Sequence, residues 1–193
     1  MKLVGLGGSL RRQSFSLAAL TEALDIAATQ NVQTELLDLR TLNLPIFLPE
    51  VSLEMYTSED QVNIARFLHA CRTADAMIWS SPTYHGTVSG TMKNAIDFME
   101  LMRNDDPPYL TGRAIGLLTI NDSAPWNAMR DSVHELRAWI SPTSIMVTKD
   151  DFTSEMVLAN GRVRNRVERM VGELLNFKLH HGPLKMESQR ISQ

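Results

Sequence analysis

The stretch Gly7-Gly8-Ser9-Leu10-Arg11-Arg12-Gln13-Ser14-Phe15-Ser16 decides the fold of this chain. It follows a short apolar run, Leu3 to Leu6, and precedes a helical pattern that begins near Phe15. This order predicts a strand, a tight turn of small residues and the N-terminus of a helix. Backbone N–H groups and the positive end of the helix dipole meet at such a turn and favour an anion. Because serine hydroxyls and an arginine fork add further donors, we expect a phosphate there.

The same stretch departs from four familiar ligand loops. A Walker A loop ends in Gly-Lys-Ser or Gly-Lys-Thr, which the sequence lacks, so nucleoside triphosphate hydrolysis is disfavoured. The dinucleotide fingerprint fails at Leu10, where its third glycine belongs, and the nucleophile elbow fails at Arg11. A tyrosine-phosphatase loop needs a cysteine nucleophile, and the single cysteine, Cys71, lies far along the chain. A turn that only caps the helix remains the simpler alternative.

Composition narrows the class of protein. The 193 residues are 44% hydrophobic and 21% charged, which is ordinary for a globular domain. We expect one domain over residues 1–181 and a mobile tail over 182–193. A net charge of -3 argues against nucleic acid, and no apolar run is long enough for a membrane span. One cysteine and a strand-like start favour the cytoplasm over secretion.

Strand and helix patterns alternate along the chain. Strands are predicted at residues 2–6, 32–39, 75–80, 113–120 and 143–148. Helices are predicted at 15–29, 58–72, up to about 99, from 125 to about 140, and at 162–180. The last helix carries an apolar stripe, with its arginines on the solvated face. Strand–helix alternation of this kind predicts a parallel sheet with right-handed crossovers.

The helix at 58–72 has the clearest start signal. Ser58 is the expected N-cap, with Gln61 as its capping-box partner. One apolar stripe is expected to face the core, with two larger residues beside it. These residues are Val62, Ala65, Leu68 and Cys71, then Ile64 and Phe67.

A long irregular connection, residues 40–57, precedes that helix. It exceeds the usual length of a connection, so we expect it to cover another part of the molecule. A surface loop with a local apolar anchor at Ile46 and Phe47 is an equally open interpretation.

A second ligand-like stretch follows the predicted strand at 75–80. It reads Ser81-Pro82-Thr83-Tyr84-His85-Gly86-Thr87-Val88-Ser89-Gly90-Thr91-Met92-Lys93-Asn94-Ala95-Ile96-Asp97. In open parallel sheets, ligands bind beyond the carboxyl ends of the strands, at the switch in strand order. We therefore expect both stretches to border one crevice. Two plainer interpretations stay open, with Tyr84 as a packed aromatic and Lys93–Asp97 as a surface pair.

Together the two stretches resemble the NAD(P)H-dependent flavin reductase family, a branch of the flavodoxin-like fold. The motifs are Gly-Ser-x-Arg-x-x-Ser-x-Ser and Pro-x-Tyr-x-x-x-x-x-Gly-x-x-Lys-x-x-x-Asp. The resemblance implies that the first motif surrounds the phosphate of FMN and that the second lies along the flavin ring. The residues implied are Ser9, Arg11, Ser14, Phe15 and Ser16, then Pro82, Thr83, Tyr84, His85 and Gly86.

A third loop, starting at Asn121, occupies the position where this family has a glycine-rich loop. The chain departs from the family there, because it has no glycine between Gly116 and Gly161. Position alone suggests that Asn121 and Ser123 face the flavin.

The resemblance implies a flavodoxin-like three-layer α/β/α sandwich with a five-stranded parallel sheet in the order 2-1-3-4-5. It also implies an FMN-dependent NAD(P)H oxidoreductase in which hydride passes from NADPH or NADH to FMN. A flavin, quinone or similar small molecule then accepts the electrons, and no side chain or metal is needed for the chemistry. Relatives suggest a homodimer or homotetramer. The alternatives are a flavodoxin-type electron carrier and a flavin-free binding module.

Overall fold

The fold is a twisted parallel sheet between two layers of helices, seen in a computed structural model that describes residues 1–181. The expected tail at 182–193 lies outside the described residues. The strands are β1 (Lys2–Gly7), β2 (Gln33–Asp38), β3 (Ala76–Ser81), β4 (Ala114–Ile120), β5 (Trp139–Ile140) and β6 (Ile145–Val147). Their order is β2-β1-β3-β4-β5, with β6 also paired to β4, and every pair is parallel. The predicted order is confirmed.

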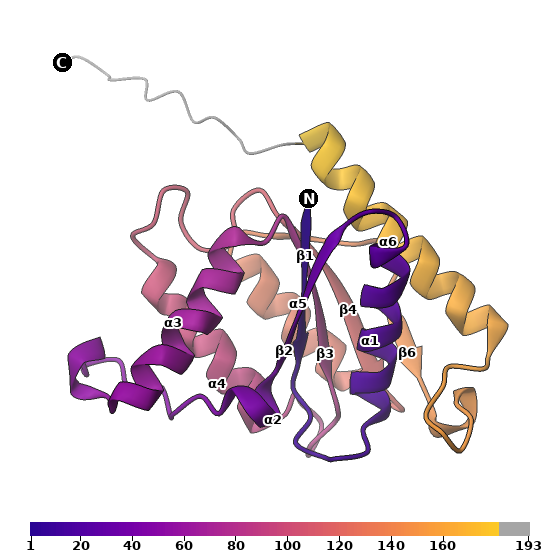
Figure 1. Cartoon of the computed structure of the whole chain (residues 1–193), viewed down its shortest axis with the longest axis horizontal. Coiled ribbons are helices and arrows are strands. Elements are labelled where there is room, and N and C mark those ends of the chain that lie inside the picture. The colour runs from indigo at the N-terminus through magenta and orange to yellow at the C-terminus, as the bar shows by residue number, and fades with distance from the viewer. Residues whose placement is uncertain (182–193) are drawn as a thin grey trace.

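Helices cover both faces of the sheet (Figure 1). One layer holds α1 (Phe15–Ala28) and α6 (Gly161–His181), and the other holds α3 (Ser58–Thr73), α4 (Gly90–Phe98) and α5 (Ala124–Glu135). The expected apolar stripe of α6 is confirmed, since Val167, Met170, Val171 and Leu174 are fully buried against the sheet. None of the helices in the described part is long and apolar enough to cross a membrane.

The fifth sheet position differs from the prediction. The helix expected to reach residue 140 ends at Glu135, and Trp139–Ile140 is already a strand. The strand expected at 143–148 shrinks to Ile145–Val147. Pro142 separates the two pieces because it has no N–H for a ladder hydrogen bond. The edge position is thus split into two short strands, both paired to β4.

Helix α3 begins and faces inward differently from the prediction. Thr57, not Ser58, is the N-cap, and its hydroxyl accepts a hydrogen bond from the Asp60 N–H at 3.2 Å. Val62 is 67% exposed and Ala65 is also exposed, so the predicted stripe is wrong at these two positions, whereas its other two members, Leu68 and Cys71, are buried as expected. The buried face is centred on the larger apolar side chains instead, because these remove more surface from water. It consists of Ile64, Phe67, Leu68, Ala70 and Cys71.

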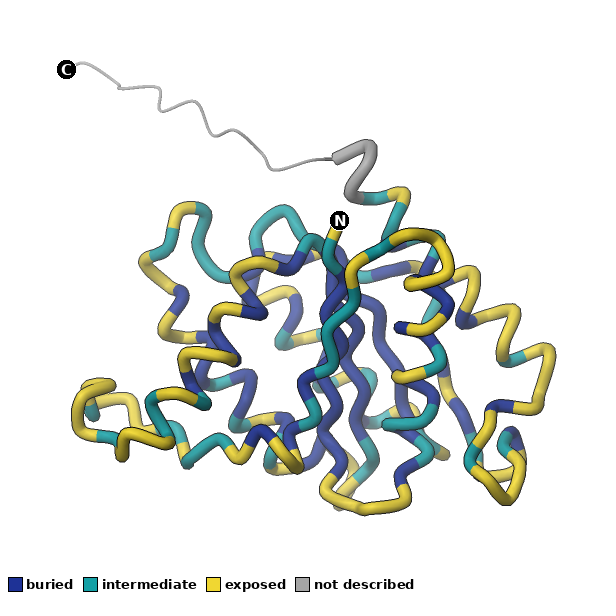
Figure 2. Tube along the Cα trace, in the orientation of Figure 1, coloured by how far each residue is buried: buried dark blue, intermediate teal, exposed yellow. Residues whose placement is uncertain are grey.

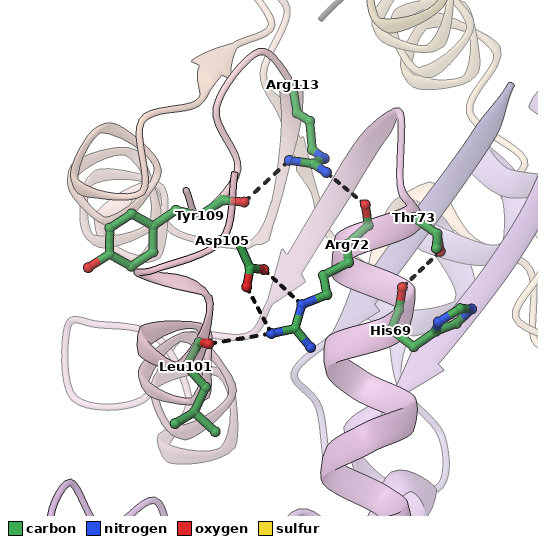
Figure 3. Close-up of polar contacts among 7 residues, drawn as sticks. All are labelled: His69, Arg72, Thr73, Leu101, Asp105, Tyr109 and Arg113. Atoms are coloured by element: carbon green, nitrogen blue, oxygen red, sulfur yellow. Dashed lines mark hydrogen bonds and ion pairs between the residues drawn. The ribbon is translucent and has the colours of Figure 1, made fainter. Parts of the chain in front are cut away.

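A network of polar contacts links α3 to the segment before β4, at the end of the sheet where the strands begin (Figure 3). Arg113, just before β4, donates hydrogen bonds to the carbonyls of Ala74 at 2.8 Å and Arg72 at 2.7 Å. Arg72 in turn binds Asp105 at 2.7 Å. These contacts fasten the C-terminal end of α3 to the segment that leads into β4. They also satisfy carbonyls that have no partner inside the helix.

The connection before α3 contains the short elements α2 (Leu39–Leu42) and η1 (Leu53–Met55). Phe47 and Tyr56 pack against Phe98 of α4, at ring centroid distances of 5.3 and 6.2 Å. The other expected anchor, Ile46, is 70% exposed. Of the two expected anchors, only Phe47 therefore packs against the core. Figure 2 shows that much of the rest of this connection is exposed.

Candidate active site

A pocket of about 390 Å³ opens at the carboxyl ends of β1, β3 and β4. In Figure 1 the carboxyl ends of these strands lie at the lower end of the sheet, where the loop after β1 turns back into α1. Three loops, far apart in the sequence, line it together. The lining residues are Ser9, Arg11, Gln13, Ser14, Phe15, Ser16, Pro82, Thr83, Tyr84, Ile120, Asn121 and Asp122.

The first loop ends in a helix N-terminus with unused donors. Ser14 is the N-cap of α1, and its hydroxyl accepts a hydrogen bond from the Leu17 N–H at 3.2 Å. The hydroxyls of Ser14 and Ser16 lie 2.9 Å apart and share one hydrogen bond, which leaves one hydroxyl proton for a ligand. The N–H groups of Phe15 and Ser16 have no acceptor among the described residues. Both serines are buried and line the pocket, so these donors are available to a ligand or to water inside it.

Ser9 and Arg11 add donors from the other side of the loop. Ser9 is 2% exposed, and its hydroxyl accepts a hydrogen bond from the Arg11 N–H at 3.3 Å. Its own N–H has no partner within residues 1–181. The Arg11 side chain is exposed and forms no hydrogen bond or ion pair with any described residue. An anion with several oxygens fits this set of donors.

The second loop forms one wall and turns sharply. Tyr84 and Thr87 exchange backbone hydrogen bonds at 3.0 and 3.2 Å. His85 and Gly86, between them, have φ values of 51° and 77°. Two central residues with positive φ are typical of a tight type I′ turn. The turn carries His85 and Gly86 out of the pocket lining, whereas Pro82, Thr83 and Tyr84 remain in it.

The third loop contributes Ile120, Asn121 and Asp122 to the pocket lining. Asn121 has a φ of 57° and donates its N–H to the Val147 carbonyl at 2.9 Å. Asp122 accepts a hydrogen bond from the Ala124 N–H at 2.9 Å, at the start of α5. Ser123 is exposed and does not line the pocket. The sequence interpretation missed Gln13, Ile120 and Asp122, although each lies within or next to a loop that it singled out.

The single cysteine contributes no reactive thiol to the pocket. Cys71 is fully buried in the core on the inner face of α3. Burial raises the pKa of its thiol to about 12 and outweighs the opposing effect of the nearby Arg113. A thiol of this kind stays protonated and behaves as a small apolar side chain.

A parallel sheet in this order, with ligand loops at the carboxyl ends of its strands, defines a flavodoxin-like protein with an anion-binding pocket. The chain belongs to the family of NADPH-dependent FMN reductases, whose match covers residues 1–152. The resemblance inferred from the two loop motifs is thereby confirmed.

Relatives and solved structures agree with this family. An NAD(P)H-dependent FMN reductase of Pseudomonas aeruginosa is 33% identical over 118 residues, which cover 61% of this chain and 58% of that relative. An FMN-dependent NADPH-azoreductase of Staphylococcus saprophyticus is 31% identical over 142 residues, which cover 69% of this chain and 72% of that relative. The first match thus spans less than two thirds of the relative's length. The flavoenzyme NAD(P)H:(acceptor) oxidoreductase of Paracoccus denitrificans has the same fold, with a TM-score of 0.73, 15% identity, and coverage of 93% of this chain and 98% of that one.

Proposed function

We propose that this protein is an FMN-dependent NAD(P)H oxidoreductase that binds the flavin in the pocket at the sheet edge. Family membership supports the chemistry. The observation that carries the location is the set of buried donors in the first loop that lack acceptors in the described part of the chain. A phosphate monoester offers acceptor oxygens for such donors, in the geometry of a helix N-terminus.

The first loop binds the phosphate in this proposal. The N–H groups of Ser9, Phe15 and Ser16 and the hydroxyls of the loop serines donate to its oxygens. Arg11 closes the site from the solvent side with a charged, two-pronged donor.

The second and third loops orient the ring. Pro82, Thr83 and Tyr84 form an apolar and aromatic wall against which a flat ring packs. Tyr84 is 37% exposed, so part of this wall stays open to a second flat molecule. Asn121 also lines the pocket, on the loop that stands in place of the family's glycine-rich loop.

Bound FMN would supply the redox chemistry, accepting hydride from NADPH or NADH and passing electrons on. The protein's own contribution is to hold the ring with one face accessible and to exclude water from the other. Donor and acceptor then use the same open face in turn. Relatives named as FMN reductases and azoreductases support a flavin, an azo compound or a similar conjugated molecule as acceptor.

Titration of the purified apoprotein with FMN, followed by anaerobic NADPH and then NADH, tests the proposal. Saturable binding and bleaching of the flavin absorbance on addition of one nicotinamide are the expected results. Binding without bleaching would indicate an electron carrier instead. Failure to bind FMN would overturn the assignment of the pocket and favour a flavin-free binding module.

We also propose a homodimer or homotetramer in the cytoplasm. Exposed apolar side chains on the segment before and within α3 support self-association: Ile46, Met55 and Val62 are 70, 73 and 67% exposed. The lone, buried cysteine fits a reducing compartment. Light scattering of the purified protein would measure its mass, and a monomer at micromolar concentration would contradict the assembly.

A further inference from the structure

The carbonyl of Gly8 is held by two hydroxyl groups from a distant segment. Ser89 donates to it at 2.6 Å and Thr91 at 3.0 Å. Both donors lie at the start of α4, 81 and 83 residues further along the chain. A carbonyl oxygen has two lone pairs, so this one is fully satisfied on the α4 side.

Close packing fixes the same contact. A Cβ added to Gly8 would lie 2.9 Å from Cβ of Met92 and 3.0 Å from Oγ of Ser89. Only glycine lets the first loop approach α4 this closely. The Gly8 N–H also donates to the Ser80 carbonyl at 2.8 Å. The Gly8 backbone is therefore held by β3 through its N–H and by α4 through its carbonyl.

This arrangement sets the direction of the next N–H group. The peptide between Gly8 and Ser9 is planar, and in a trans peptide the carbonyl and the N–H point in opposite directions. Because the Gly8 carbonyl points toward Ser89 and Thr91, the Ser9 N–H points away from them. Ser9 lines the pocket, and neither Ser89 nor Thr91 does. The N–H that lacks an acceptor is thus presented on the pocket side.

The second loop is tied into the same network. The Ser89 N–H donates to the Ser81 hydroxyl at 3.1 Å, and that hydroxyl donates to the Pro82 carbonyl at 2.9 Å. Ser89 is 2% exposed and also caps α4 by accepting from the Met92 N–H. One serine therefore joins the ring wall to the loop that holds the phosphate in the proposed function.

We propose that Ser89 and Thr91 are positioning residues for phosphate recognition, which act by orienting the Gly8–Ser9 peptide. Neither residue lines the pocket. If the carbonyl were released and the peptide rotated, an oxygen would face the phosphate in place of an N–H. The proposal rests on the assignment of the FMN phosphate to the first loop.

Paired titrations of the apoprotein with FMN and with riboflavin, which lacks the phosphate, test the proposal. Thr91→Val removes one donor to Gly8 without removing the cap of α4. We expect FMN affinity to fall about threefold to tenfold, the range for one hydrogen bond, with riboflavin affinity unchanged. Thr91→Ser keeps the hydroxyl and should bind FMN with the wild-type affinity. A general structural defect would weaken both ligands, and would overturn the positioning role.

Two further variants complete the design. Thr111→Val removes a hydroxyl that donates to the Pro108 carbonyl at 2.7 Å, away from the pocket, and should leave both affinities unchanged. Arg11→Ala tests the underlying site. If Arg11→Ala weakens FMN and Thr91→Val does not, only the positioning role fails. If neither variant affects FMN, the phosphate site itself is wrong.

Discussion

Arg11 is the one charged donor among the residues that line the described pocket, and its side chain has no competing partner there. It lies on the exposed side of a loop whose other donors come from backbone and buried hydroxyls. A guanidinium in this position closes the phosphate site without a desolvation cost in the free protein, because water still reaches it.

Replacing Arg11 with Ala should weaken FMN binding by about 1.5–3 kcal/mol, the range for a hydrogen bond to a charged group. Fluorescence quenching of FMN during titration measures the change. Arg12→Ala is the matched control, because the neighbouring side chain is also exposed but does not line the pocket. Equal losses in the two variants would reduce the role of Arg11 to general charge attraction.

At the scale of elements, α6 holds the split edge of the sheet through a single carboxylate. Glu173 accepts hydrogen bonds from the Ser141 hydroxyl, the Thr143 N–H and the Thr143 hydroxyl. Burial alone would raise the pKa of Glu173, but these hydrogen bonds outweigh burial and lower it below the ordinary 4.5. The turn around Pro142 is therefore tied to the helix behind it.

Glu173→Gln should destabilise the fold by about 1–2 kcal/mol near neutral pH, a figure reduced for the partial exposure of the carboxyl. A lowered folded-state pKa stabilises above the unfolded value and loses its effect as pH falls through the folded value. The difference from wild type should therefore shrink below about pH 4.5. Urea unfolding at pH 7 and pH 4 measures it. Glu168→Gln, on the exposed face of the same helix, should show neither effect.

The hydrogen bonds of Arg113 lie at the end of the sheet away from the pocket, so they allow an effect on folding stability to be distinguished from an effect on FMN binding. Arg113→Met removes the donors to the Ala74 and Arg72 carbonyls and should cost about 1–3 kcal/mol of unfolding free energy. FMN affinity, measured below the unfolding temperature, should stay at the wild-type value because the pocket lies at the other ends of the strands. A loss of FMN affinity in the same variant would show that the two ends of the sheet, the one with Arg113 and the one with the pocket, are coupled.

At the scale of the whole molecule, three loops from distant parts of the chain form one pocket. A ligand that binds only this folded arrangement must stabilise it. FMN at 100 times its dissociation constant should add about 2.7 kcal/mol to the free energy of unfolding. Thermal unfolding with FMN, riboflavin and no ligand measures the effect, and a melting temperature that FMN leaves unchanged would contradict a preformed site.

The sequence predicted those parts of the molecule that depend on local pattern. Short segments of consecutive residues indicate the small-residue turn at Gly7–Ser16, the alternation of strands and helices and the apolar stripe of α6. The two loop motifs identified the family. Local pattern misled at α3, where Val62 and Ala65 are exposed, because periodicity gives the spacing of an apolar face but not its direction. It misled again at the edge of the sheet, where Pro142 breaks a strand into two.

The sequence by itself determined the alternation of strands and helices and the two main ligand loops, because each follows from residues that lie close together in the chain. The resemblance of those loops to a known family supplied the strand order. Only the tertiary structure decided that His85 and Gly86 turn away from the pocket, that Asp122 lines it, and that Ser89 and Thr91 hold Gly8. These features depend on backbone direction and on contacts across more than 80 residues. Such contacts form when the sheet brings the ends of separate strands together.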